Sequence, residues 1–136
     1  QNALIPILLL AQKENEGWLN EECMQHVADI CEVPLTHVEG VVTFYTMFRL
    51  KPPGKYHLQV CTCVPCCLVG GTELLEHTEK ILDIHAGHTT DDGVFSIEEM
   101  ECIGACIFAP AIIVNEDYHE QLTPEKMEKM IDELRQ

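Results

Sequence analysis

The sequence predicts an α/β protein in which a short helical bundle precedes a domain built on a β-sheet. Apolar residues recur at helical spacing in the first part of the chain, whereas they alternate at a period of two after residue 55. Between the two patterns lies Leu50-Lys51-Pro52-Pro53-Gly54, where two prolines and a glycine in succession can continue neither a helix nor a strand. We therefore expect a helical bundle over residues 1–51 and a sheet domain over residues 55–136.

Three helices are expected before this boundary. Dense apolar residues from Ala3 to about Glu14 indicate a helix with a broad buried face, and Gly17 is suited to stop it. Asn20 can cap a second helix, and Pro34 can open a third at its first turn. The apolar positions at helical spacing are Met24, Val27, Ala28 and Cys31 in the second helix and Val38, Val41, Val42 and Tyr45 in the third.

The sheet domain is expected to begin with a strand. Apolar and polar residues alternate from Lys55 to Val60, which predicts one buried face and places Cys61 at the end of the strand. The elements expected next are a helix from about Thr72 to Leu82 and strands near Val94 to Met100, Ala111 to Val114 and Tyr118 to Leu122.

The chain is expected to close with an amphipathic helix. Thr123 can cap this helix, Pro124 suits its first position, and Glu125 places an acid in its first turn. An apolar stripe follows at the spacing of one helical face, so packing on the sheet explains its methionines better than a role as sulfur ligands. The stripe consists of Met127, Met130, Ile131 and Leu134.

Composition and charge exclude two classes of partner. The formal net charge is -15, and the few basic side chains are scattered, so we expect no nucleic acid to bind. The longest apolar stretch, Ala3 to Ala11, is interrupted by Pro6 and falls well short of the ~20 residues that a membrane-spanning helix needs. Direct insertion into a membrane is therefore not expected, and the basic start and cleavage site of a secretory signal are also missing.

Cysteine spacing carries the strongest functional information in the sequence. Six of the eight cysteines form two tight groups, roughly forty residues apart. Iron prefers thiolate ligands, and a 2Fe-2S cluster needs two sulfurs on each iron, so its four cysteines must converge in two pairs. Cys61-x4-Cys66 and Cys102-x3-Cys106 supply two such pairs, each in a loop after an apolar strand. These four residues are candidate ligands of one 2Fe-2S cluster.

Spacing by itself leaves two other kinds of site open. Four thiolates can also hold tetrahedral zinc, although structural zinc usually prefers shorter C-x2-C knuckles. The segment Cys63-Val64-Pro65-Cys66 after a strand is the place where a thioredoxin-like protein keeps its redox-active dithiol. A dithiol would leave three cysteines of the two pairs without a role, whereas a cluster would leave out Cys63 and Cys67.

Several segments resemble one known family. These are GKYHLQVCTCVPC, ECIGACIFAP and the stretch from Asn115 that runs into LTPE, together with Gly17-Trp18-Leu19 and the segment VTFYTMF that begins at Val42. They are similar to the thioredoxin-like 2Fe-2S subunit of NADH:ubiquinone oxidoreductase, respiratory complex I. The resemblance covers essentially the whole chain.

The resemblance implies a fold and a set of ligands. The expected fold is α/β, a thioredoxin-like 2Fe-2S ferredoxin domain preceded by a short N-terminal helical bundle. The family's C-x4-C and C-x3-C ligands fall on Cys61, Cys66, Cys102 and Cys106, so one 2Fe-2S cluster is expected there and no catalytic residue elsewhere. The sequence departs from the family at Cys63 and Cys67, which are not ligands by this mapping, and at Phe108, where the family often has Asn.

The resemblance also implies partners and a location. The chain would exchange single electrons with the flavin of the NADH-oxidising subunit and would pack against it and other peripheral-arm subunits. FMN and NADH are expected on that partner, because no Gly-rich phosphate loop occurs here. Oxidoreductase activity would belong to the complex, on the matrix side of the mitochondrial inner membrane or the cytoplasmic side in a bacterium. Alternatives are the equivalent subunit of an NAD-linked hydrogenase or formate dehydrogenase, or a thiol-disulfide oxidoreductase using Cys63 and Cys66.

Overall fold

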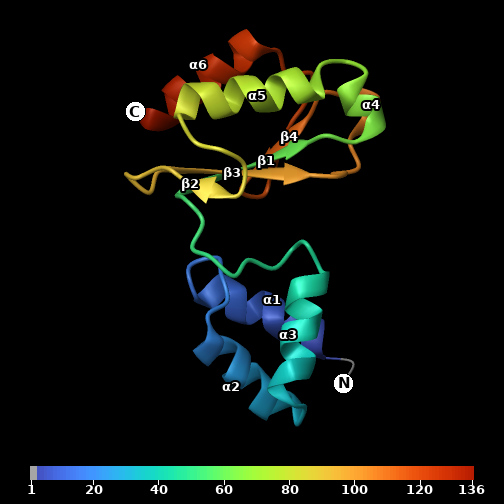
Figure 1. Ribbon diagram of the computed structural model, residues 1–136, viewed down its shortest axis with the longest axis vertical. Helices are drawn as coiled ribbons and strands as arrows, with labels where there is room; N and C mark the ends of the chain where they lie inside the picture. Colours follow the sequence, from blue (N-terminus) through green and yellow to red (C-terminus); the bar gives the residue numbers. More distant parts are fainter. Residues whose placement is uncertain (1–2) are drawn as a thin grey trace. The chain divides into compact units, whose positions relative to one another are not determined.

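The computed structural model describes residues 3–136, which form six α-helices, one 3-10 helix and one five-stranded sheet. The chain divides into two compact units, Gln1–Pro53 and Gly54–Gln136. The first unit is helical and the second contains the sheet (Figure 1). The predicted α/β class, with helices first, is confirmed. None of the helices in the described part of the chain is long and apolar enough to cross a bilayer.

The helical unit consists of α1 (Leu4–Glu14), α2 (Glu21–Cys31) and α3 (Leu35–Phe44). Their apolar faces meet in one core, as the helical spacing predicts. Tyr45 is an exception, because α3 ends before it and leaves its side chain 38% exposed. The buried residues of this core are Leu4, Leu8, Leu19, Met24, Val27, Ala28, Val38, Val42 and Phe48.

Asn20 caps α2 as predicted, and its loss should be measurable. Its Oδ1 atom accepts a hydrogen bond of 2.7 Å from the backbone N–H of Cys23, which is otherwise without an intrahelical partner. We expect Asn20→Ala to lower the free energy of unfolding by about 1 kcal/mol, whereas Asn20→Asp should keep most of it because a carboxylate oxygen also caps. Urea denaturation followed by circular dichroism would measure both. An equal loss in both variants would contradict this role.

The sheet unit is organised around two long parallel strands. β1 (Tyr56–Cys61) pairs in parallel with β3 (Phe95–Met100). Three short strands complete the sheet in antiparallel pairings, in the order β2-β3-β1-β4-β5. They are β2 (His88–Thr89), β4 (Ile112–Val114) and β5 (Asp117–His119).

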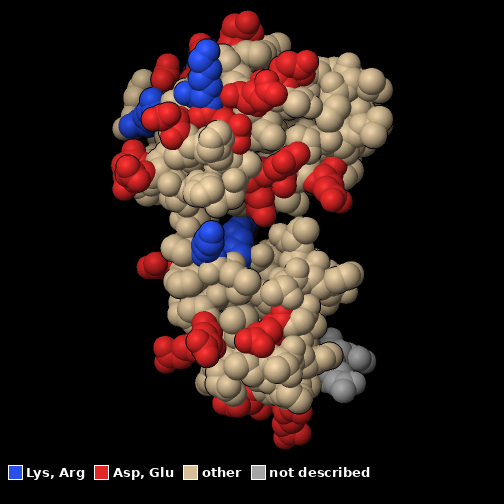
Figure 2. All heavy atoms as spheres, in the orientation of Figure 1, with Lys and Arg blue, Asp and Glu red and all other residues tan. Residues whose placement is uncertain are grey.

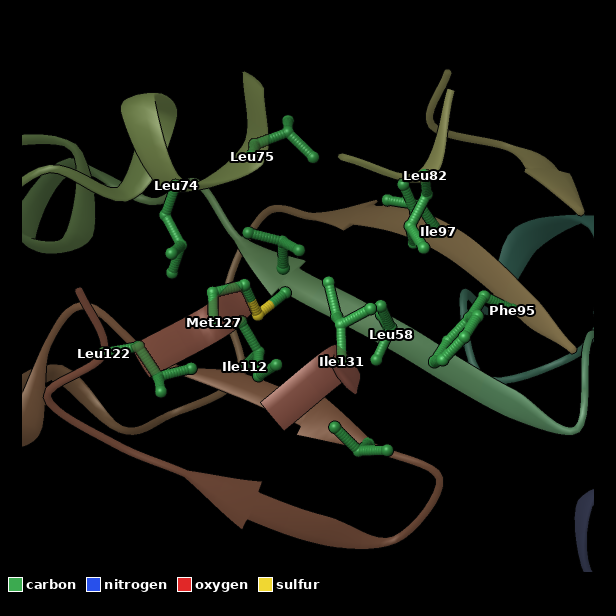
Figure 3. Packing of buried hydrophobic residues seen from close by; sticks show 12 residues of the cluster. Leu58, Leu74, Leu75, Leu82, Phe95, Ile97, Ile112, Leu122, Met127 and Ile131 are labelled. Carbon is green, nitrogen blue, oxygen red and sulfur yellow. The ribbon is translucent and has the colours of Figure 1, made fainter. Parts of the chain in front are cut away.

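Helices α5 (Gly71–Leu82) and α6 (Pro124–Arg135) cover one face of this sheet (Figure 1). Alternate residues of the strands point toward the two helices and form the main core (Figure 3). Within α6 the expected stripe is confirmed: Met127 and Ile131 are fully buried, and Met130 and Leu134 pack at the margin. Thr123 caps α6 as predicted, since its hydroxyl accepts from the N–H of Lys126. The other buried core residues include Leu58, Val60, Leu74, Leu75, Phe95, Ile97 and Ile112.

The opposite face of β1 differs from its expected exposure. His57 and Gln59 alternate with the apolar residues as predicted, but each residue is only 7% exposed. Their polar atoms are satisfied by β3, because His57 Nδ1 lies 2.7 Å from Ser96 Oγ and the Gln59 amide donates to Glu98 at 3.2 Å. His57 Nε2 also contacts that carboxylate at 2.9 Å. The alternation therefore predicted the strand correctly. It did not predict that the polar residues of the strand are buried, which is possible because their polar atoms are hydrogen-bonded.

Three short elements were not expected from the sequence. They are β2, the single-turn helix α4 (Val64–Cys67) and the 3-10 helix η1 (Cys106–Phe108). The last strand is also shorter than predicted, because β5 ends at His119 and the chain then turns through Gln121 at a φ of 51°. Both α4 and η1 lie within the predicted cysteine loops and shape the backbone around the cysteine pairs.

Candidate metal centre

Both predicted cysteine pairs lie in loops that leave the sheet at the same edge. Cys61 at the end of β1 is paired in register with Met100 at the end of β3. The first loop continues from there to Cys66, and the second contains Cys102 and Cys106. Because parallel strands end at one edge, two loops that are distant in sequence begin side by side. The topology therefore explains why the pairs meet.

The cysteine sulfurs form two groups that share one member. The Sγ atoms of Cys61, Cys63 and Cys66 lie within 4.8 Å of one another. The Sγ atoms of Cys63, Cys102 and Cys106 form a second group within the same limit. Each predicted pair is thus brought together, and Cys63, which sequence reasoning left without a role, lies in contact range of both pairs.

The local backbone explains how the loops present these sulfurs. Cys63 is the N-cap of α4 and has extended backbone angles. The single turn of α4 then places the Cys66 sulfur within 4.8 Å of the Cys63 sulfur. In the second loop Gly104 has a φ of +80°, a backbone angle that residues with a Cβ rarely adopt. That turn lets the chain reverse between Cys102 and the start of η1 at Cys106.

The two pairs differ sharply in their exposure to solvent. Cys61 is 2% and Cys66 is 1% exposed, whereas Cys102 and Cys106 are exposed. The buried pair packs with Ile103 and Ala111 in a small apolar cluster. A cofactor held between the pairs would therefore have one side in an apolar wall and the other near the protein surface.

Backbone amides and neighbouring thiols set the charge of the buried pair. Burial raises the pKa of the Cys61 thiol, but hydrogen bonds from the backbone amides of Cys63 and Ile103, together with those from the Cys66 and Cys63 thiols, outweigh this effect, so its pKa lies below the ordinary value. Burial and the nearby Cys61 sulfur raise the pKa of Cys63 to about 12 and that of Cys66 to about 11. Several thiolates this close together repel one another. A bound cation would compensate this repulsion and allow all of them to be deprotonated.

The remaining cysteines lie outside both groups. Cys67 is next to Cys66 in sequence, but its Sγ contacts the carbonyl oxygen of Thr62 at 3.0 Å and accepts from Thr72 Oγ1 at 3.3 Å. Cys23 and Cys31 belong to α2 in the helical unit. All eight cysteines are free thiols, so no disulfide competes for the ligands.

This donor set fits a 2Fe-2S cluster. The cluster requires four thiolates in two pairs, and the structure supplies Cys61 with Cys66 and Cys102 with Cys106. The two groups of sulfurs do not merge into a single group within 4.8 Å, which suits two metal ions better than one. Amide donors at Cys61 and at Cys66, where the Ala111 N–H contributes, are the kind of hydrogen bond that tunes such ligands.

Comparison with known proteins identifies the family. Residues 1–135 match the family described as thioredoxin-like 2Fe-2S ferredoxin. The chain belongs to this family. Membership establishes the thioredoxin-like ferredoxin fold and gives the chain one 2Fe-2S cluster as its cofactor, as predicted.

Relatives of this thioredoxin-like ferredoxin are named for NADH-quinone oxidoreductase and for NADH dehydrogenase (ubiquinone). It is 48% identical to a subunit of the NADH-quinone oxidoreductase of Rickettsia felis, over 98% of this chain and 80% of the relative. It is 42% identical to the mitochondrial flavoprotein 2 of NADH dehydrogenase (ubiquinone) from Dictyostelium discoideum, over 99% of this chain and 55% of that relative. The predicted resemblance is therefore confirmed.

A solved structure shares the fold of this thioredoxin-like ferredoxin. The air-oxidised NAD+-reducing NiFe-hydrogenase matches with a TM-score of 0.80 over 94% of this chain at 21% identity. The chain spans only 22% of that hydrogenase chain. The likeness includes the helical unit as well as the sheet unit, because it covers nearly all of the chain.

One feature near the cysteines was missed by sequence reasoning. Large apolar side chains on both ligand loops point into solvent: Leu68 is 81% and Ile107 is 88% exposed. Loop apolar residues give no periodicity, so pattern analysis has no means of deciding whether they are buried. The others that are exposed here are Val64, Val69 and Phe108.

Proposed function

We propose that this chain is the electron-transfer subunit of an NADH-quinone oxidoreductase and holds its 2Fe-2S cluster through Cys61, Cys66, Cys102 and Cys106. The observation that carries the ligand assignment is the convergence of two cysteine pairs from loops at one sheet edge. The relatives named for NADH-quinone oxidoreductase and for mitochondrial flavoprotein 2 support the choice of host complex. Oxidoreductase activity belongs to that complex.

The residues around the four cysteines position these ligands; they do not perform chemistry on a substrate. A bound 2Fe-2S cluster supplies reversible one-electron transfer. The amides of Cys63 and Ile103 donate to the Cys61 sulfur and disperse its negative charge. The apolar cluster with Ile103 and Ala111 excludes water from the buried pair, and the Tyr118 hydroxyl fixes the second loop by donating to the Ile103 carbonyl at 3.0 Å.

Both ligand loops carry exposed apolar side chains that suit contact with a protein partner. These side chains, here called the loop rim, are Val64, Leu68, Val69, Ile107 and Phe108. Exposed apolar side chains grouped in this way are typical of interaction sites. Charged side chains are sparse over the α4 end of the sheet unit on the face shown in Figure 2. A partner docked on the loop rim would bring its own redox group close to Cys102 and Cys106, which shortens the path for the electron.

We propose the flavin-bearing, NADH-binding subunit as the protein that covers the loop rim. FMN and NADH would then be bound by that partner, and other peripheral-arm subunits would hold the complex together. We propose the matrix side of the mitochondrial inner membrane, or the cytoplasmic side of a bacterial membrane, as the location. Relatives from a bacterium and from a mitochondrion support these two settings. An NAD-linked hydrogenase or formate dehydrogenase is the alternative host; the fold shared with the NAD+-reducing hydrogenase is compatible with the first of these.

Anaerobic purification of the full chain tests the proposed cofactor. We expect a coloured protein with two irons and two acid-labile sulfides per chain and a one-electron paramagnetic signal after reduction. Iron and sulfide analysis, visible absorption and electron paramagnetic resonance (EPR) measure these properties. A colourless protein that unfolds with a chelator would instead indicate structural zinc.

A thiol-disulfide oxidoreductase is the second candidate, and one observation favours it. The sulfurs of Cys63 and Cys66 lie within 4.8 Å of one another directly after β1. The pKa values of these two thiols argue against a dithiol activity. An attacking cysteine needs a lowered pKa, whereas the pKa values of Cys63 and Cys66 are both raised. A colourless chain that reduces a disulfide substrate and loses this activity in Cys63→Ala would favour the dithiol function.

A further inference from the structure

Cys63 holds a position that the proposed four-ligand site does not use. Its sulfur is the only one shared by the two groups of cysteines found among the described residues. It lies within 4.8 Å of the Cys61 and Cys66 sulfurs in one group and of the Cys102 and Cys106 sulfurs in the other. A side chain that merely filled space between the loops would not require a thiol at the point where both pairs meet.

The neighbouring Cys67 shows that sequence proximity alone does not produce this arrangement. Its exposed sulfur contacts the Thr62 carbonyl oxygen at 3.0 Å and the Thr72 hydroxyl at 3.3 Å. With these contacts its sulfur belongs to neither group. The two extra cysteines of the first loop are therefore distinct: one faces the candidate metal centre and one does not.

The backbone around Cys63 leaves its side chain free to adjust. It is the N-cap of α4 but makes no side-chain capping bond, so moving its sulfur breaks no helix contact. The helix that follows has a single turn, from Val64 to Cys67. The Cys63 side chain is only half-buried, which leaves room for rotation about its Cα–Cβ bond.

We propose that Cys63 is a reserve ligand that binds the cluster when a cysteine of either pair is lost or chemically modified. This inference rests on the proposed function, since it requires the four-cysteine site. The Cys63 thiol releases its proton to solvent as its sulfur forms a bond to the iron that has lost a ligand. The oxidation state of the iron does not change in this exchange.

The need for a reserve ligand follows from the exposure of one pair. Cys102 and Cys106 are exposed and open to oxidants and alkylating reagents, whereas Cys61 and Cys66 are buried. Cys63 lies within 4.8 Å of both exposed sulfurs but is itself less accessible. The most useful substitution therefore replaces a member of the exposed pair.

The experiment compares Cys106→Ala with two double variants of the full chain, assembled and purified without oxygen. Alanine is used because a serine oxygen could itself bind iron. Cys106 is exposed, so its replacement leaves no buried cavity. We expect Cys106→Ala to keep its iron and sulfide with a shifted absorption and EPR spectrum, because Cys63 replaces the missing ligand. Cys63→Ala/Cys106→Ala should lose the cluster, and Cys67→Ala/Cys106→Ala should match Cys106→Ala.

Two further measurements separate this inference from the proposed function. The wild type and Cys63→Ala should hold equal iron and sulfide, since Cys63 is not one of the four regular ligands and alanine keeps the backbone amide that donates to the Cys61 sulfur. Loss of the cluster in Cys63→Ala would overturn both the four-ligand assignment and the reserve role. Loss of the cluster in Cys106→Ala would overturn the reserve role alone. Retention of the cluster in Cys63→Ala/Cys106→Ala would overturn the reserve role together with the assignment of Cys106 as a ligand. The parallel pair Cys102→Ala and Cys63→Ala/Cys102→Ala repeats the comparison at a second exposed ligand, and circular dichroism checks that each variant is folded.

Discussion

Replacing Cys61 and Cys106 together by alanine is expected to abolish cluster binding in an otherwise folded chain. The double variant removes one ligand from each pair, so Cys66, Cys102 and Cys63 are the thiols that remain at the site. Three thiolates cannot complete two irons, each of which needs two sulfurs from the protein. The iron and acid-labile sulfide content should fall from two of each per chain to background, and the visible absorption should disappear.

The chain offers a matched control for the number of cysteines removed. Cys23→Ala/Cys31→Ala also deletes two thiols, but both belong to α2 in the helical unit and lie outside the two sulfur groups. This control should keep its full iron and sulfide content. Persistence of the cluster in Cys61→Ala/Cys106→Ala, or an equal loss in the control, would show that the ligands have been assigned incorrectly.

The convergence of the cysteine pairs was predictable because strand ends can be located from a period-two pattern. The pattern after residue 55 placed Cys61 at the end of a strand, and β1 ends at that residue. The second strand was expected near Val94 to Met100 and is Phe95–Met100. Family resemblance then paired the two loops. The division into domains 1–51 and 55–136 stays a prediction; the structure divides the chain into the compact units Gln1–Pro53 and Gly54–Gln136.

The arrangement inside the loops was not predictable from the residues. No periodic pattern distinguishes Cys63 from Cys67. Their sulfurs lie in different places because of the single helical turn α4, and a helix this short forms only through packing against the rest of the fold. The partner of Cys67 is the hydroxyl of Thr72 in the next helix, a contact that appears only when the turn has formed. The burial of His57 likewise depends on Ser96, a partner on another strand. Side-chain roles set by long-range contacts are therefore the part that needs the structure.

Gly71→Ala is expected to destabilise both the fold and the bound cluster, because Gly71 touches the backbone that carries the buried ligands. A Cβ at this position would lie 2.8 Å from the carbonyl carbon of Cys66, 2.9 Å from its oxygen and 3.0 Å from the carbonyl oxygen of Cys61. These are backbone atoms, so no side-chain rotation can relieve the overlap. Either α5 or the ligand loop must shift, at a cost of about 1–3 kcal/mol in the free energy of unfolding.

Gly40→Ala provides the matched comparison. Gly40 lies within α3, where a Cβ would meet no atom within 4 Å, so the same substitution should stabilise the chain by roughly 0.5–1 kcal/mol. Urea unfolding measures the opposite signs, and the rate at which visible absorption decays in a chelator measures the hold on the cluster. Decay should be faster in Gly71→Ala and unchanged in Gly40→Ala. If both variants keep the cluster equally well, then contact between α5 and the Cys61–Cys66 loop does not help to hold the ligands, and the buried pair must be positioned by the sheet edge alone.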